Sequence, residues 1–114
     1  MTSKQRAYLK SLAVNIDTIF QIGKSGVSEE ICLQLLNALN ARELIKIKVL
    51  ETCPTNPKET AEQISQSIDA DVVQVIGTKI VLYRVSDFEK NRKIDIRKIK
   101  WELVFMVAHL IHLI

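Results

Sequence analysis

Histidine is absent from residues 1–84 of this 114-residue chain, and the only two histidines are His109 and His112. A Cys–His or Ser–His pair would therefore have no base in the body of the protein, which argues against nucleophilic catalysis. The two histidines are three residues apart, but no third ligand accompanies them, so we expect no metal site. Most acidic side chains fall on predicted helix faces, where solvation is their ordinary role. We therefore predict a protein that is not an enzyme and needs no cofactor.

Cysteine is also scarce, with only Cys32 and Cys53 in the chain and no CxxC motif. This usage favours free thiols in a reducing cytosol. A secretory signal is not expected, because Lys4, Arg6 and Lys10 interrupt the first segment. These features predict a cytoplasmic protein.

A long apolar run is missing except at the end, where residues 103–114 are apolar apart from the two histidines. Twelve residues are too few for a bilayer-spanning helix, which needs about 20. Three roles remain open for this tail: a helix packed on the body, a contact with a partner protein or a second copy, and an interfacial anchor.

The chain has only three glycines, and two of them, Gly23 and Gly26, bracket one short loop. A β-branched and aromatic run precedes this loop, and a helical pattern starts near Ser28. Such a loop can present backbone N–H groups to a phosphate, with Lys24 as an added cation. A plain strand-to-helix turn explains the glycines equally well. A nucleotide-binding P-loop is disfavoured, because Thr18 stands where that motif requires its first glycine.

Positive charge is concentrated at the two ends of the chain. Residues 1–26 contain four basic residues and one acidic residue, and residues 85–114 contain six and four. Residues 27–84 contain six basic and eight acidic residues. A local basic patch can recruit a polyanion even when the whole protein is only weakly basic.

The hydrophobic pattern predicts a single α/β domain with the order α-β-α-β-α-β-β. We expect helices over about 2–16, 28–41 and from Pro57 to about residue 68, and strands over 17–22, 44–50, 72–76 and 79–84. In the first strand Thr18, Phe20 and Ile22 are expected on one face, with Ile19 and Gln21 on the other. Crossover helices favour parallel pairing and a hairpin forces antiparallel pairing, so the four-stranded sheet should be mixed.

Two of these strands carry features that bear on function. Lys46 and Lys48 alternate with apolar residues, so one face of that strand is predicted to be buried and the other basic. Gly77 and Thr78 separate the last two strands, which predicts a hairpin with a type II′ turn. Cations, backbone donors and the lack of catalytic groups fit nucleic-acid binding. RNA is favoured, because a Gly-x-x-Gly loop beside a mixed sheet clamps the sugar-phosphate backbone in KH-type modules.

Four motifs in order resemble the bacterial YhbY-like proteins, which are stand-alone CRM domains (chloroplast RNA splicing and ribosome maturation). They are SKQRAYL at 3–9, IGKSG at 22–26, ARELIKIKV at 41–49 and VIGTKIVLYR at 75–84. The resemblance covers about residues 2–85. It implies a fold similar to the C-terminal domain of translation initiation factor 3 and association with precursors of the large ribosomal subunit.

The resemblance also implies site residues. Gly23, Lys24 and Gly26 match the family loop directly, whereas Ser25 departs from the commoner glycine. Further basic positions of the family pattern match Arg6, Lys46, Lys48 and Arg84. Thr78 stands where the hairpin often has asparagine, which affects only the turn.

We therefore predict an RNA-binding domain over residues 1–86, followed by a charged linker and an apolar extension over 87–114. RNA, ribosomal RNA of large-subunit precursors in particular, is the expected partner, and no small-molecule substrate is expected. The predicted contact residues are Gly23, Lys24, Ser25, Gly26, Arg6, Lys10, Lys46, Lys48 and Arg84. The alternative is a protein-interaction module that acts through the apolar tail, where self-association would also occur.

Overall fold

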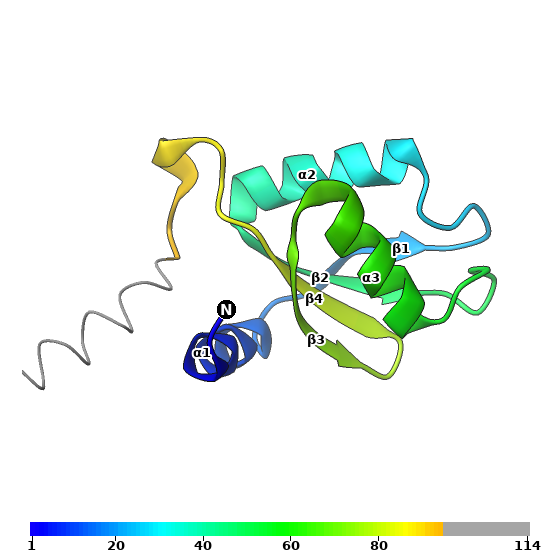
Figure 1. Cartoon of the computed structure of the whole chain (residues 1–114), viewed down its shortest axis with the longest axis horizontal. Helices are drawn as coiled ribbons and strands as arrows, with labels where there is room; N and C mark the ends of the chain where they lie inside the picture. The colour runs from blue at the N-terminus through cyan, green and yellow to red at the C-terminus, as the bar shows by residue number, and fades with distance from the viewer. Residues whose placement is uncertain (95–114) are drawn as a thin grey trace, which may run out of the picture.

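A computed structural model describes residues 1–94 of the chain (Figure 1). Its elements follow the predicted order: α1 (Ser3–Ala13), β1 (Thr18–Ile22), α2 (Glu29–Arg42), β2 (Leu44–Val49), α3 (Pro57–Ile68), β3 (Asp71–Ile76), β4 (Lys79–Tyr83) and the short 3₁₀ helix η1 (Glu89–Asn91). The predicted histidine pair and apolar tail lie outside the described residues. None of the helices within residues 1–94 is long and apolar enough to cross a bilayer.

Each α-helix begins where the sequence supplies a capping residue. The Thr2 side chain accepts a hydrogen bond from the Gln5 N–H, and the Gln5 side chain accepts one from the Thr2 N–H. Ser28 caps α2, and Asn56 caps α3 ahead of Pro57 in the first turn. These contacts satisfy N–H groups that would otherwise lack partners at the helix starts.

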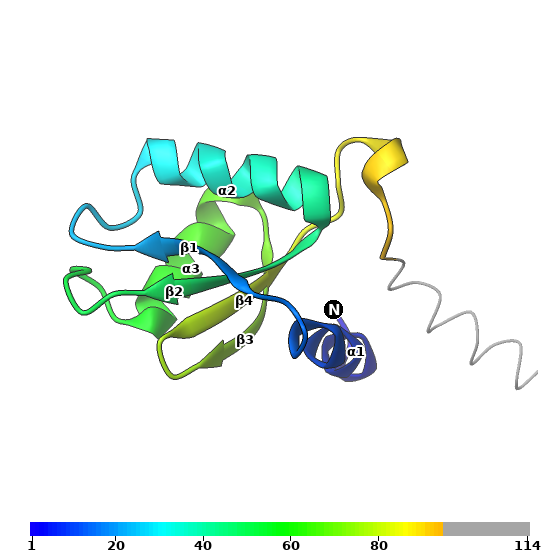
Figure 2. The same ribbon diagram turned by 180° about the vertical axis from the view of Figure 1, so that it is seen from behind.

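The four strands form one mixed sheet in the order β1-β2-β4-β3, as Figure 2 shows from behind. β1 pairs with β2 in parallel, and the other two pairings are antiparallel. Gly77 has φ +58 in the β3–β4 turn, whereas Thr78 is not among the residues with positive φ. A type II′ turn requires this combination, so the predicted hairpin is confirmed.

The predicted alternation of β1 is wrong at one point. Ile19 and Phe20 both pack against the cluster under α2 and α3, although opposite faces were expected. The register of β1 against β2 shifts between Thr18 and Phe20, and an inserted residue of this kind breaks strict alternation. A similar shift occurs in β3, between Val72 and Gln74.

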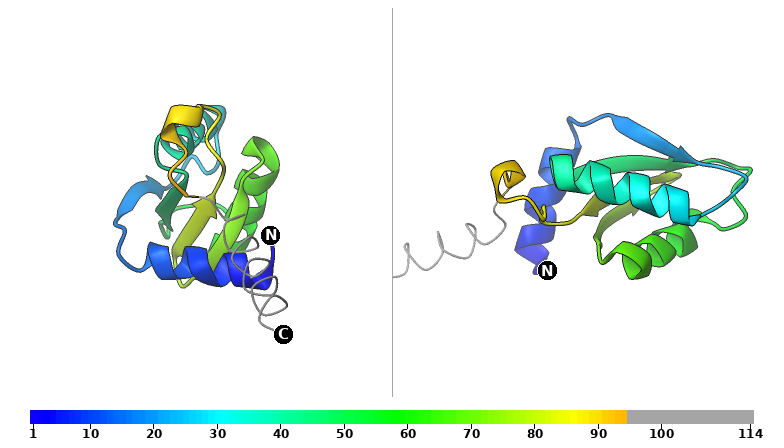
Figure 3. Two further views of the ribbon diagram at one scale, coloured as in Figure 1. Left: turned by 90° about the vertical axis from the view of Figure 1, so that its left-hand side faces the viewer. Right: turned by 90° about the horizontal axis from the view of Figure 1, so that it is seen from above.

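The sheet is covered differently on its two faces (Figure 3). Helices α2 and α3 cover one face through Leu35, Leu39 and Ile64, which pack on β-strand residues such as Ile45 and Ile47. Helix α1 crosses one end of the other face. Its buried residues Leu9 and Ala13 cluster there with Leu44, Val73, Val81 and Tyr83. The rest of that second face is left open by the helices.

Candidate nucleic-acid interface

The Gly23–Gly26 loop is a tight turn at the end of β1. The Gly26 N–H donates to the Gly23 carbonyl at 2.9 Å, and Gly26 has φ +63. A Cβ on Gly26 would lie 3.2 Å from Cγ of Pro54, so the loop also packs closely against the segment that follows β2. Gly26 is buried, whereas Lys24 and Ser25 are exposed at the tip. Both a left-handed conformation and a close approach therefore require glycine here.

Lys46 and Lys48 lie on the open face of the sheet, Lys46 level with Thr18 at the start of β1 and Lys48 nearer the loop. Ile47 and Val49 are buried under α2 and α3, so the alternating Lys46 and Lys48 point to the opposite face. Lys48 pairs with Gln21 of β1, two positions before Gly23. Because β1 and β2 are parallel, the loop and Lys48 share one end of the sheet.

Lys79 joins these lysines and is a residue that the sequence analysis missed. It lies directly opposite Lys48 in the antiparallel β2–β4 pair, so both side chains project from the same face. Neither lysine forms an ion pair with any residue of the described part of the chain. Like charges placed directly opposite each other are destabilising, so a bound anion would relieve this pair.

Arg6 and Lys10 extend the positive charge along α1. Both are exposed, and they line a shallow hollow on the helix with Met1, Ser3 and Ala7. At 100° per residue, Arg6 and Lys10 lie about 120° and 160° around α1 from Leu12. Leu12 lines a hollow with Ile94, Arg42 and the first residues of β2, so the two cations lie on the flank of α1 that faces away from this hollow.

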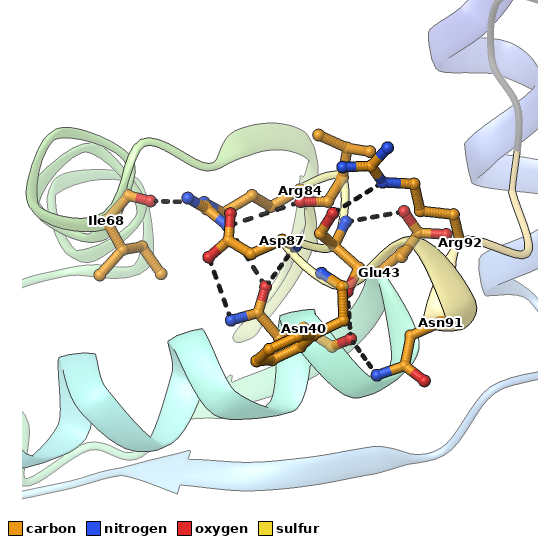
Figure 4. A network of polar contacts seen from close by, with 10 residues as sticks. Asn40, Glu43, Ile68, Arg84, Asp87, Asn91 and Arg92 are labelled. Carbon is orange, nitrogen blue, oxygen red and sulfur yellow. Dashed lines mark hydrogen bonds and ion pairs between the residues drawn. The ribbon is translucent and has the colours of Figure 1, made fainter.

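Arg84 does not belong to this group. Its side chain is 21% exposed and forms an ion pair with Asp87 at 3.1 Å. Its guanidinium also donates to the carbonyl of Ile68 at 3.1 Å and to Asn40 Oδ1 at 3.4 Å (Figure 4). These partners lie at the ends of α2 and α3, on the face opposite Lys46 and Lys48. The geometry therefore gives Arg84 a role in holding the fold.

The segment beside the glycine loop also contains Cys53. Burial raises the pKa of this thiol, but hydrogen bonds with Thr55 and Thr60 outweigh that effect and lower the pKa overall. Cys32 and Cys53 are both free, as predicted. No group of three or more potential metal ligands occurs within residues 1–94.

We call Arg6, Lys10, Lys46, Lys48 and Lys79, together with the loop at residues 23–26, the basic face. Five strand positions separate Leu44, under α1, from Val49, which lies level with Ile22 just before the loop, and this is about 17 Å at 3.3 Å per residue. The acidic Glu29 and Glu30 occupy the first turn of α2, just beyond the loop. An anion is therefore favoured on the loop and the open sheet, and disfavoured on the axis of α2.

Comparison with known proteins identifies the class of this domain. The model of the CRS1/YhbY (CRM) domain matches residues 1–84, which include the four strands and three α-helices found within residues 1–94. The chain belongs to this family of RNA-binding, non-enzymatic domains. The resemblance in the four motifs is thus confirmed.

Individual relatives agree with this assignment. The chain is 40% identical over 96 residues to the "Probable RNA-binding protein YqeI" of Bacillus subtilis, spanning 84% of this chain and 98% of the relative. It is 34% identical over 90 residues to an "RNA-binding protein" of Haemophilus influenzae, spanning 79% and 91%. The solution structure of the hypothetical protein SAV1595 from Staphylococcus aureus is similar, with a TM-score of 0.67, 46% identity and coverage of 83% and 99%.

Proposed function

We propose that this protein binds structured RNA through the basic face and assists assembly of the large ribosomal subunit. The observation that carries the proposal is the set of exposed or half-buried cations on α1, the open sheet face and the glycine loop. Its lysines have no carboxylate partners in the described residues, and an RNA backbone would supply the missing negative charge. Membership in the CRM family and the names of the relatives support RNA as the polyanion.

The loop and the sheet contribute in different ways. Gly23 and Gly26 let the chain turn tightly enough for backbone N–H groups to approach a phosphate, and Lys24 adds a mobile charge. Lys46, Lys48 and Lys79 present fixed positions along the sheet, with their stems supported by neighbouring strands. Contacts of this kind fix the position of an RNA without reading its bases. The basic face should therefore prefer RNA by shape and charge more than by sequence.

Salt titration tests the proposal directly. Six cations could each neutralise one phosphate, which gives a slope of log affinity against log salt of at most about −4 to −5. Binding to a stem–loop RNA would be measured by fluorescence anisotropy between about 50 and 200 mM salt. Tight binding with no salt dependence would contradict an electrostatic contact surface.

The assignment to ribosome assembly needs its own experiment. A tagged full-length chain should co-sediment with precursors of the large subunit on a sucrose gradient and be absent from mature particles. A charge-reversed variant, Lys24→Asp together with Lys48→Glu, should leave those fractions. Sedimentation of the parent only with the small subunit, or with no particle, would contradict this role.

A further inference from the structure

Glu43 is a fully buried acidic residue in a position that the family motif leaves unexplained. It follows α2 directly, has φ +65 and is 0% exposed. Its carboxylate accepts hydrogen bonds from the backbone N–H groups of Ser86 at 2.8 Å, Lys93 at 2.7 Å and Ile94 at 3.1 Å. A buried carboxylate is costly unless it is hydrogen-bonded, and N–H donors to an ionised group make strong bonds.

All three donors come from residues 85–94, which we call the strap. The strap lies beyond the stretch that matches the CRM domain, which ends at residue 84. Asn40 makes two hydrogen bonds with the first half of the strap. The Asn40 carbonyl accepts a hydrogen bond from the Ser86 hydroxyl at 2.6 Å, and Asn40 Oδ1 accepts one from the Asp87 N–H at 2.9 Å. Asn91 donates to the same carbonyl at 3.2 Å (Figure 4). The strap is thus fastened to the end of α2 at several points.

The far end of the strap reaches α1. Ile94 is half-buried and packs against the cluster that contains Leu9 and Ala13 of α1. It also lines a hollow of about 340 Å³ together with Leu12 and Ile16. Glu43 holds the Ile94 N–H and the Lys93 N–H before it, so it fixes where Ile94 meets the cluster between α1 and the sheet.

We propose that Glu43 is a positioning residue for RNA binding, because its hold on the strap keeps α1 and its cations in register with the sheet lysines. This inference rests on the proposed function. Ile94 supports α1 on the Leu12 side, and Arg6 and Lys10 lie on the other side of the helix. Releasing the strap lets α1 shift, which separates Arg6 and Lys10 from Lys46 and Lys48.

The test compares Glu43→Gln with Glu30→Gln in the full-length chain. Both changes remove one negative charge, and Glu30 is exposed in the first turn of α2. If charge alone mattered, both variants would bind a stem–loop RNA as tightly as the parent or tighter. The proposal predicts that Glu43→Gln weakens RNA binding by about three- to tenfold, which corresponds to the interaction energies usually measured between residues in contact. Glu30→Gln should not weaken it. Equal binding by the two variants would overturn the inference.

A readout at the strap separates positioning from unfolding. In Glu43→Gln the amides of Ser86, Lys93 and Ile94 should exchange with solvent faster, while amides in the centre of β2 and β4 keep their protection. If Glu43→Gln does not fold, Ile94→Ala replaces it, because it removes the contact with α1 without burying an unpaired group. Ile94→Ala should weaken binding over the same range, and parent-like affinity in that variant would overturn the inference.

Double-variant cycles give the sharpest outcome. The loss caused by Glu43→Gln should disappear in an Arg6→Ala/Lys10→Ala background and persist in a Lys24→Ala background. An equal loss in both backgrounds would show general destabilisation and overturn the inference. If neither background variant weakens binding on its own, the basic face itself is refuted, which distinguishes failure of the proposed function from failure of the role of Glu43.

Discussion

Replacing Lys79 with glutamate should change stability and RNA binding in opposite directions. Lys79 faces Lys48 directly across the β2–β4 pair, and the two like charges repel. Lys79→Glu converts this repulsion into an attraction. Cross-strand charge pairs are worth about 0.2–1 kcal/mol each, so the free energy of unfolding should rise by roughly 0.5–1 kcal/mol after solvent screening of an exposed site. For a domain of this size that corresponds to an increase in Tm of about 2–6 °C.

Binding should move the other way. With a slope of about 0.8 per phosphate, one lost contact weakens binding about fivefold at 0.15 M salt. Charge reversal counts as two charges and should weaken it about twentyfold. Lys79→Ala should show the smaller loss and a smaller gain in stability. Lys58→Glu is the binding control, since Lys58 belongs to α3 on the other side of the sheet.

Thermal unfolding followed by circular dichroism and anisotropy titration with a stem–loop RNA measure the two effects. The salt slope should fall by about one to two charges in Lys79→Glu and stay unchanged in Lys58→Glu. A lower Tm in Lys79→Glu would refute the cross-strand repulsion. Parent-like affinity in the same variant would refute the placement of RNA on this part of the sheet.

Three further predictions concern the loop and the tail. Lys24→Ala should change the free energy of unfolding by no more than about 0.5 kcal/mol, yet it should weaken binding uniformly across RNA sequences. Lys24→Asp should weaken binding further. If both variants bind RNA as tightly as the parent, the loop is only a turn. Gly26→Val should cost about 1–3 kcal/mol in urea unfolding, because φ is +63 and its Cβ would lie 3.2 Å from Pro54; an unchanged midpoint would contradict this strain. Deleting residues 101–114 should preserve the fold and RNA binding but change solubility or self-association, which gel filtration would measure. In the full chain, the fluorescence emission of Trp101 reports whether this segment begins in a buried environment.

Much of the fold could be predicted because local signals agreed with one another. The capping residues, the alternation in β2 and the glycine turn each pointed to the element that formed. The alternation in β1 failed because a register shift depends on the neighbouring strand and leaves no local pattern. The same limit explains why Lys79 was not identified as a site residue, since the sequence alone places it only at the start of a strand. Its position opposite Lys48 follows from the pairing of two residues that are 31 positions apart in the sequence.

The buried polar contacts were beyond sequence reasoning for a related reason. Glu43 stands in a motif beside Arg42 and Leu44, where an exposed carboxylate is the ordinary expectation. Its backbone donors come from positions 43 to 51 residues later, and no periodicity indicates them. Arg84 matched a basic position of the family pattern, but its guanidinium donates hydrogen bonds to Ile68 and Asn40 and so stabilises the fold. Residue type alone does not distinguish a cation that is available to a ligand from one whose hydrogen bonds are made within the fold.

The register shifts in β1 and β3 have a consequence for how this sheet behaves in a crowded cell. Both shifts occur in the outermost strands, whereas the pairing between the central strands β2 and β4 is regular. An outer strand offers unpaired N–H and carbonyl groups that could recruit a strand from another molecule. A bulge increases the local twist and disturbs the repeat that such a strand would need. We expect this domain to resist aggregation by sheet extension at either edge, even when its RNA partner is absent.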